Sequence, residues 1–128
     1  MIFDTDVLIW FLRGDEKAFE AVERSIPFSI SIVTYMELMQ GMRNKQEAEK
    51  MKKAFKEMGV EIIPIDESVS FQAAEYVENY ALSNSMELAD ALIAATCVQR
   101  NEALFTANDK HYKVVKDLQL NIFRPKKN

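Results

Sequence analysis

The chain has 128 residues and a net charge of −4, with 48% hydrophobic and 28% charged residues. These values are ordinary for one globular domain spanning residues 1–128, and they exclude a disordered or fibrous chain. The negative charge excludes a strong overall attraction to nucleic acid, although a local basic strip or a bound divalent cation can reverse the sign at one site.

The sequence contains neither an N-terminal signal pattern nor an apolar run of the roughly 20 residues that cross a bilayer. Its single cysteine, Cys97, has no partner for an internal disulfide and lies in an apolar helical run. We interpret Cys97 as a core residue rather than a nucleophile. Together these features predict a cytoplasmic protein without a membrane partner.

The first ten residues contain the earliest candidate for a functional site. Residues 1–3 form an apolar run that is typical of a short buried strand, and the strand is expected to end at Asp4. Thr5 or Asp6 is a suitable cap for a helix over residues 7–12. Because α/β sheets bind ligands outside the carboxyl ends of their strands, Asp4 is a candidate site residue, with helix capping as the alternative.

Helical and strand patterns then alternate along the chain. Helices are expected over residues 16–24, 33–42, 44–58, 68–82 and 86–100, and strands over residues 28–32, 60–65, 102–105 and 120–123. Residues 106–112 are expected to form a loop with a short helical turn, and residues 124–128 a polar tail. This alternation predicts an α/β fold in which a parallel sheet, joined by right-handed crossovers, has helices on both faces.

Several acidic residues interrupt the apolar pattern near strand ends or helix starts. Glu37 lies in the first turns of the helix after the second strand, and Asp90 lies near the start of the most apolar helix. The run Thr106-Ala-Asn-Asp109 follows the fourth strand. Because the carboxyl ends of parallel strands share one edge of the domain, we expect these acids to gather around Asp4.

Each acid also has a purely structural alternative. Glu37 can complete a capping box with Thr34. Asp90 can interact with the dipole at its helix N-terminus, and Asp109 can be a turn or cap residue. The lysine-rich stretch at residues 45–56 is most simply a solvated helix face, with an RNA-tracking role as the alternative. Three further acids are interpreted as cap or surface residues: Asp66, Glu67 and Glu87.

Carboxylates at close quarters repel one another unless a cation lies between them. Oxygen ligands suit Mg²⁺ or Mn²⁺, whereas a lone His111 and a lone Cys97 argue against zinc. The sequence has no Gly-rich phosphate loop and no G-x-S-x-G motif. The acids therefore predict metal-assisted hydrolysis, in which the cation lowers the pKa of a bound water and stabilises charge on a phosphoryl oxygen.

Four segments, in this order and spacing, resemble PIN-domain ribonucleases, and among them the VapC toxins of toxin–antitoxin pairs. They are IFDTDVLI at residues 2–9, SIVTYMELMQG at 31–41, LADALIAAT at 88–96 and LFTANDKHY at 104–112. The resemblance implies a PIN domain with a flavodoxin-like parallel sheet and endonucleolytic cleavage of RNA with Mg²⁺ or Mn²⁺. It also implies a homodimer and a cognate, VapB-like antitoxin, with tRNA or another structured RNA as the expected substrate.

Carried over by motif, the metal ligands and catalytic acids are Asp4, Glu37 and Asp90. They would orient a water for in-line attack on phosphorus and leave a 5′-phosphate. Thr106 matches a hydroxyl that the family uses near the position of Asp4.

Two positions depart from the family pattern. The family often has an acid two residues after the threonine, where this chain has Asn108, so Asp109, one position later, is the candidate for a fourth catalytic acid. If Asn108 takes that place, a second metal ion should bind weakly or not at all. Asp6 stands where the family often has Asn or Ser. Asp6, Thr106 and Asn108 are expected to contact the metal ligands rather than the metal ion itself.

Two other functions are compatible with part of the sequence. Asp4-Thr-Asp6-Val7 resembles the opening motif of haloacid dehalogenase-type phosphatases, in which Asp4 would be a nucleophile and Asp6 an acid or base. That chemistry also needs a later lysine and a paired-acid motif, for which Asn108-Asp-Lys110 is a poor substitute. The other alternative is a catalytically silent PIN-like binding module, which the joint presence of three acids disfavours.

Overall fold

The computed structural model describes residues 1–126, and residues 127–128, the end of the predicted polar tail, lie outside the described residues. Its sheet contains parallel strands in the spatial order β3-β2-β1-β4-β5. Along the chain these are β1 (Ile2–Phe3), β2 (Ser29–Ser31), β3 (Glu61–Ile63), β4 (Leu104–Thr106) and β5 (Leu120–Ile122). The predicted parallel α/β fold is confirmed, with strands that are shorter than, or shifted from, the predicted ranges.

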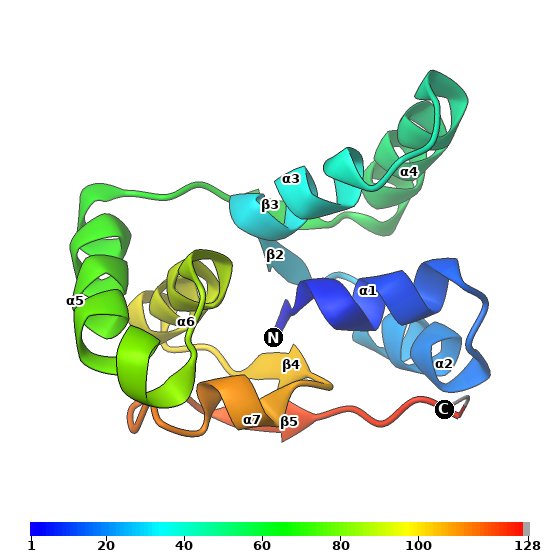
Figure 1. The fold of residues 1–128 in the computed structure, drawn as a ribbon. Helices are drawn as coiled ribbons and strands as arrows, with labels where there is room; N and C mark the ends of the chain where they lie inside the picture. The colour runs from blue at the N-terminus through cyan, green and yellow to red at the C-terminus, as the bar shows by residue number, and fades with distance from the viewer. Residues whose placement is uncertain (127–128) are drawn as a thin grey trace.

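Helices cover both faces of this sheet. They are α1 (Thr5–Leu12), α2 (Glu16–Ser25), α3 (Ile32–Gln40), α4 (Lys45–Met58), α5 (Glu67–Asn84), α6 (Leu88–Arg100) and α7 (Asp109–Tyr112). Figure 1 shows α5 and α6 on one side of the sheet and α1 and α2 on the other. Within residues 1–126, no helix has the length and apolar character needed to cross a membrane.

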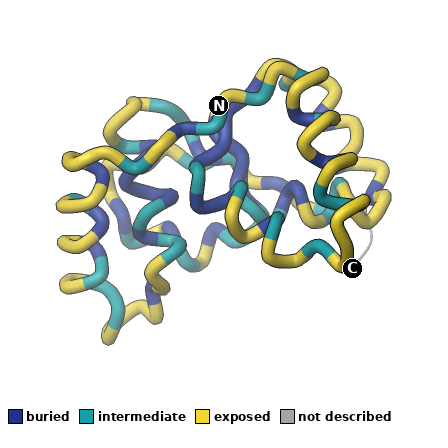
Figure 2. Tube along the Cα trace, turned by 90° about the horizontal axis from the view of Figure 1, so that it is seen from above, coloured by how far each residue is buried: buried dark blue, intermediate teal, exposed yellow. Residues whose placement is uncertain are grey.

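The two-residue strand β1 is stabilised by burial on both faces. Successive strand residues point to opposite sides, so Ile2 packs into the core beneath α5 and α6, whereas Phe3 packs into the core beneath α1, α2 and α4. The Phe3 ring stacks on Phe28 with 4.2 Å between centroids. Each such side chain contributes about 1.5–3 kcal/mol on full burial. Figure 2 shows the buried segments running through the middle of the molecule, with exposed turns on the outer helices.

Helix α3 begins earlier than predicted, and its cap differs. Ser31 is the N-cap, and its Oγ accepts a 3.0 Å hydrogen bond from the backbone N–H of Val33. Thr34 is fully buried inside the helix. The predicted capping box of Thr34 with Glu37 is therefore wrong, and the Glu37 carboxylate is available for other contacts.

Strand β4 begins two residues later than predicted because α6 closes with a left-handed turn. Asn101 has a φ of 54°, and the N–H of Glu102 donates to the carbonyl of Cys97 over 3.0 Å. These bonds occupy the backbone that the prediction assigned to the strand. Cys97 is fully buried, as predicted, and this burial raises the pKa of its thiol.

The strand order defines a topological switch point at the centre of the sheet. From β1 the chain continues to β2 and β3 on one side, then crosses through α5 and α6 to β4 on the other side. In open α/β sheets, ligands bind in the crevice outside the carboxyl ends of the strands at such a point. Residue 4 follows β1 directly, and β4 ends at Thr106, so both lie at this crevice.

Candidate functional site at the switch point

Asp4 and Thr106 meet at the carboxyl ends of the two central strands. Asp4 is the N-cap of α1, so its structural alternative holds as well, whereas Thr5 and Asp6, the other predicted caps, lie inside the helix. Asp4 Oδ1 accepts from the N–H of Thr5, and Asp4 Oδ2 accepts from the Thr106 hydroxyl, each over 2.8 Å. Asp4 is 5% exposed and Thr106 is fully buried. The site therefore begins with a buried carboxylate whose two oxygens are both held.

Asp6 brings a second carboxylate to the same crevice. Its Oδ2 accepts from the N–H of Ala107 over 3.1 Å, whereas its buried Oδ1 has no hydrogen-bond partner. Burial, followed by the charge of Asp6, raises the pKa of Asp4 to about 7. Burial also raises the pKa of Asp6, and the nearby charge of Asp90 adds to the rise. The crevice thus brings together two buried carboxylates whose charged forms are disfavoured by burial and by neighbouring negative charge.

Glu37 approaches the crevice from α3. Its Oε1 accepts a 2.6 Å hydrogen bond from the hydroxyl of Thr5, which follows Asp4 directly. The Thr5 hydroxyl also lies 3.0 Å from the hydroxyl of buried Thr34. Thr5 therefore connects α3 to the start of α1 and places Glu37 beside the end of β1.

Asp90 lies in the first turn of α6 and has contacts of two kinds. It forms a capping box with Glu87, whose N–H donates to Asp90 Oδ2 over 3.3 Å, so the structural alternative for Asp90 holds as well. Asp90 Oδ2 also lies 3.2 Å from His111 Nδ1, and the Tyr112 hydroxyl donates to Asp90 Oδ1 over 3.4 Å. Asp90 is thereby tied to α7, which follows β4.

Asn108 contacts residues of the crevice, whereas the side chain of Asp109 contacts Arg124. The Asn108 N–H donates to Thr106 Oγ1 over 2.9 Å, and its side-chain Nδ2 lies 3.0 Å from His111 Nδ1. Because His111 Nδ1 can either donate to Asp90 or accept from Asn108, it satisfies one of these neighbours at a time. The side chain of Asp109 pairs with Arg124 over 2.8 Å, and this guanidinium lowers the pKa of Asp109.

The donor set of the crevice suits a hard divalent cation. In the side-chain arrangement of residues 1–126, no three Asp, Glu, His or Cys side chains converge closely enough to enclose a metal ion. Nevertheless, Asp6 Oδ1 has no hydrogen-bond partner, and the pKa values of Asp4 and Asp6 are raised. Carboxylates have these properties when no positive charge stabilises their ionised forms. Oxygen donors of this kind fit Mg²⁺ or Mn²⁺.

Sequence reasoning misses three of the residues that organise this crevice. The sequence pattern indicates Thr5 only as a helix cap, and the contacts of His111 and Tyr112 with Asp90 are not predicted. A signal exists for the last two, because they lie three and four positions after Asn108 and so share one side of the predicted helical turn.

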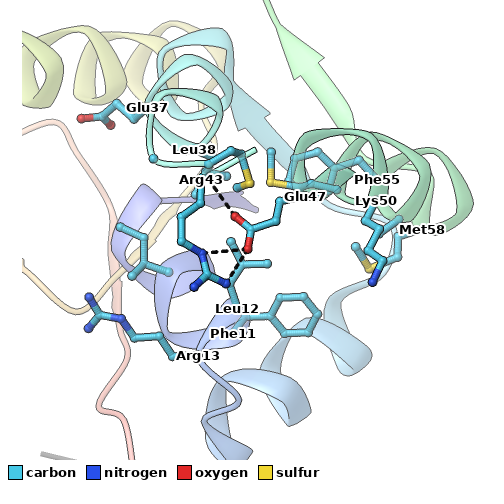
Figure 3. A pocket seen from close by; sticks show the side chains of 15 residues that line it. Phe11, Leu12, Arg13, Glu37, Leu38, Arg43, Glu47, Lys50, Phe55 and Met58 are labelled. Atoms are coloured by element: carbon cyan, nitrogen blue, oxygen red, sulfur yellow. Dashed lines mark hydrogen bonds and ion pairs between the residues drawn. The ribbon is translucent and has the colours of Figure 1, made fainter. Parts of the chain in front are cut away.

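A groove of about 810 Å³ runs from Glu37 along α1, α3 and α4. Its lining is largely apolar, with Leu12 and Phe55 on opposite walls, and Figure 3 shows Arg13, Arg43 and Lys50 around it. The Arg43 guanidinium pairs with Glu47 over 2.6 Å. Glu37, which contacts Thr5 beside the crevice, is also one of the residues that line this groove.

The chain matches the family model for the PIN domain over residues 1–118. It is 30% identical over 125 residues to ribonuclease VapC10 of Mycobacterium tuberculosis, covering 93% of this chain and 90% of that protein. It is 31% identical over 124 residues to ribonuclease VapC1 of Methanocaldococcus jannaschii, covering 96% of this chain and 86% of that protein. A toxin–antitoxin complex from Klebsiella pneumoniae superposes with a TM-score of 0.77 at 25% identity, covering 91% of this chain and 93% of that one.

The parallel sheet and the acidic crevice at its switch point are features of an α/β protein built to bind a ligand at that edge. With the matches above, the chain belongs to the PIN-domain family, in the group of VapC-type ribonucleases. The resemblance found in the four sequence motifs is thereby confirmed.

Proposed function

We propose that this protein is an endoribonuclease that depends on Mg²⁺ or Mn²⁺ and serves as the toxin of a toxin–antitoxin pair. The observation that carries the proposal is the acidic crevice, in which Thr106 at the end of β4 holds Asp4 at the end of β1. The proposal is supported by the names of two relatives, both ribonucleases. Cleavage of tRNA or another structured RNA stays a prediction.

In this proposal Asp4, Glu37 and Asp90 hold the cation. When bound, the cation supplies a water of lowered pKa and stabilises charge on a phosphoryl oxygen. The chain's own residues fix the ligands, because the Thr106 hydroxyl holds Asp4 and the Thr5 hydroxyl holds Glu37. Such hydrogen bonds orient metal ligands and commonly change metal affinity by about 10–100-fold when they are removed.

We favour Asp6 over Asp109 as the fourth carboxylate. Asp6 Oδ1 is buried without a partner, and its charge adds to that of Asp4. Asp109 is instead neutralised by Arg124, with Lys113 Nζ at 3.7 Å as a second cation. Of the two, Asp6 has the oxygen that is available to a cation.

The decisive experiment compares cleavage of RNA by the wild type and by Asp4→Asn, each with Mn²⁺ and with a chelator. We expect the wild type to cleave with Mn²⁺ only and to leave 5′-phosphate ends, and we expect Asp4→Asn to be folded and inactive. Clean Asp4→Asn protein that retained cleavage would overturn the proposal. A small phosphate monoester serves as the second substrate, and its turnover would support the phosphatase alternative instead.

A wild type that cleaves neither substrate, while still binding an antitoxin, would support the silent binding module. The family match over residues 1–118 favours the nuclease over the phosphatase.

We also propose that the groove along α1, α3 and α4 receives a segment of the cognate antitoxin. Its apolar walls and the cations Arg13 and Lys50 suit an amphipathic segment with acidic side chains. The similar structure from Klebsiella pneumoniae is a toxin–antitoxin complex, which supports this class of partner. Because Glu37 lines the groove, a bound antitoxin would also restrict access to the crevice. The homodimer stays a prediction, which light scattering of the purified chain tests.

A further inference from the structure

One loop contacts three of the carboxylates in the crevice. Thr106 donates to Asp4, the N–H of Ala107 donates to Asp6, and His111 and Tyr112 contact Asp90. These carboxylates come from α6 and from the start of α1, so the loop at residues 106–112 sets their relative positions. β4 ends at Thr106, and the last sheet-like bond here is from the N–H of Phe123 to the Thr106 carbonyl, at 2.8 Å. Beyond this point side chains rather than the sheet hold the loop, and one of these contacts comes from outside the crevice.

Arg124 supplies that contact from the segment after β5. Its Nη1 donates to the carbonyl of Ala107 over 3.0 Å, and its Nη2 donates to Asp109 Oδ1 over 2.8 Å. One guanidinium therefore holds both ends of the turn at residues 107–109. Ala107 therefore contacts both residues: its carbonyl accepts from Arg124, and its N–H donates to Asp6.

The environment of Arg124 separates this role from one in overall stability. The Arg124 side chain is 58% exposed, and ion pairs so accessible to water contribute little to the free energy of unfolding. A planar guanidinium that donates to a carbonyl and a carboxylate at once nevertheless fixes a geometry. The Arg124 pair therefore affects the conformation of the loop more than the stability of the fold.

We propose that Arg124 is a positioning residue, which orients the carboxylates of the crevice by holding the loop at residues 106–112 through Ala107 and Asp109. The proposal rests on the proposed function, because it concerns the same crevice. Arg124 acts through the loop and is assigned no contact with RNA or with the cation.

The sign of the effect on cation affinity makes the proposal testable. Removing a positive charge near an acidic site should tighten binding of Mn²⁺ if only charge matters. Loss of positioning should weaken it. Arg124→Gln is therefore expected to lower the Mn²⁺ affinity by about 10–100-fold, the range found when groups that orient metal ligands are removed.

The matched control is Lys126→Gln. Lys126 lies two residues further on, and its Nζ pairs with Glu16 over 2.7 Å rather than with the loop. Both variants remove one positive charge from the same segment. Calorimetric titration with Mn²⁺ should show weaker binding for Arg124→Gln and an unchanged or slightly higher affinity for Lys126→Gln. Equal or tighter binding by Arg124→Gln would overturn the proposal.

A second measurement does not depend on the metal. Hydrogen exchange of the Ala107 and Asn108 amides in metal-free protein should be faster in Arg124→Gln than in the wild type, and unchanged in Lys126→Gln. Unchanged exchange at these amides also counts against positioning. If the wild type cleaves no RNA, the proposed function fails while these two measurements still decide the role of Arg124.

A double-mutant cycle tests whether Arg124 acts on the crevice through Asp109. If Arg124 acts through Asp109, then Asp109→Asn combined with Arg124→Gln should bind Mn²⁺ about as well as the weaker single variant. Fully additive losses would contradict that route.

Discussion

The hydroxyl of Thr106 donates a 2.8 Å hydrogen bond to Asp4 Oδ2 across 102 positions of sequence. It joins the ends of β1 and β4, the two strands between which the sheet order reverses. The same hydroxyl accepts from the N–H of Asn108. Thr106 thus links the first strand, the fourth strand and the loop that reaches Asp90.

Thr106→Val removes this hydroxyl without changing the shape of the side chain. Because the bond lowers the pKa of Asp4, its loss should raise that pKa further and weaken Mn²⁺ binding by about 10–100-fold. Calorimetric titration measures the affinity. The control is Thr96→Val, which removes another fully buried hydroxyl, one that donates to Leu92 O within α6. Equal losses in both variants would show that the Thr106 effect is not specific to the site.

The metal-free protein should lose stability as the pH rises towards neutrality. The pKa of Asp4 is about 7 in the fold against an ordinary value of 3.8, so the folded state binds this proton more tightly than the unfolded state does. The resulting stabilisation is fully present below about pH 4 and is lost as the pH rises through about 7. The full shift corresponds to roughly 4 kcal/mol.

Urea denaturation in the presence of chelator, at about pH 5.5 and about pH 8, measures this change. Asp4→Asn is the control and should lose most of the pH dependence. A wild type as stable at the higher pH as at the lower would contradict the expectation. Adding Mn²⁺ to the wild type should restore stability at the higher pH, since the cation binds the folded state.

Asp6→Asn and Asp109→Asn separate the two candidates for the fourth carboxylate. Each variant removes one negative charge and keeps the shape of the side chain. We expect Asp6→Asn to weaken Mn²⁺ binding by about 10-fold or more, because it removes the unpartnered buried oxygen. Asp109→Asn should weaken it less, through the loop alone. The reverse order of affinities would contradict the choice of Asp6 as the fourth carboxylate.

Leu12→Glu should weaken antitoxin binding and leave RNA cleavage intact. Leu12 is 49% exposed and lines the groove, so a partner that covers its exposed half gains on the order of 1 kcal/mol, and a glutamate there would also place a charge against apolar side chains. The expected loss is about 10–100-fold in affinity, measured by titrating the purified antitoxin. Leu82→Glu, on the fully exposed end of α5, should bind normally. Equal affinity of the two variants would place the antitoxin elsewhere.

Much of the crevice can be predicted from the sequence, because the carboxyl ends of parallel strands lie at one edge of the sheet. An acid directly after β1 and a threonine at the end of β4 had to lie close together once these strands were neighbours. Glu37 is harder to place, because residues 29–34 contain several possible caps and only the structure selects Ser31. The helix start that follows from this choice places Glu37 beside Thr5.

Other parts of the site depend on contacts that no local pattern contains. Asp109 resembles a turn residue in sequence, and its partner Arg124 lies beyond β5. The pair forms because β5 joins the sheet beside β4, a choice of edge that periodicity does not specify. Asp90 follows a helix rather than a strand, so the rule that strand ends share an edge does not position it; its contacts with α7 do.

The placement of β1 also bears on the order in which the site forms during synthesis. β1 precedes the other strands in the sequence but lies at the centre of the sheet, and its neighbour β4 is made about a hundred residues later. Asp4 therefore emerges early but receives its Thr106 partner only when most of the chain has been translated. A chain that ends before β4 lacks this bond and the loop that contacts Asp6 and Asp90, so we expect it to bind Mn²⁺ only weakly.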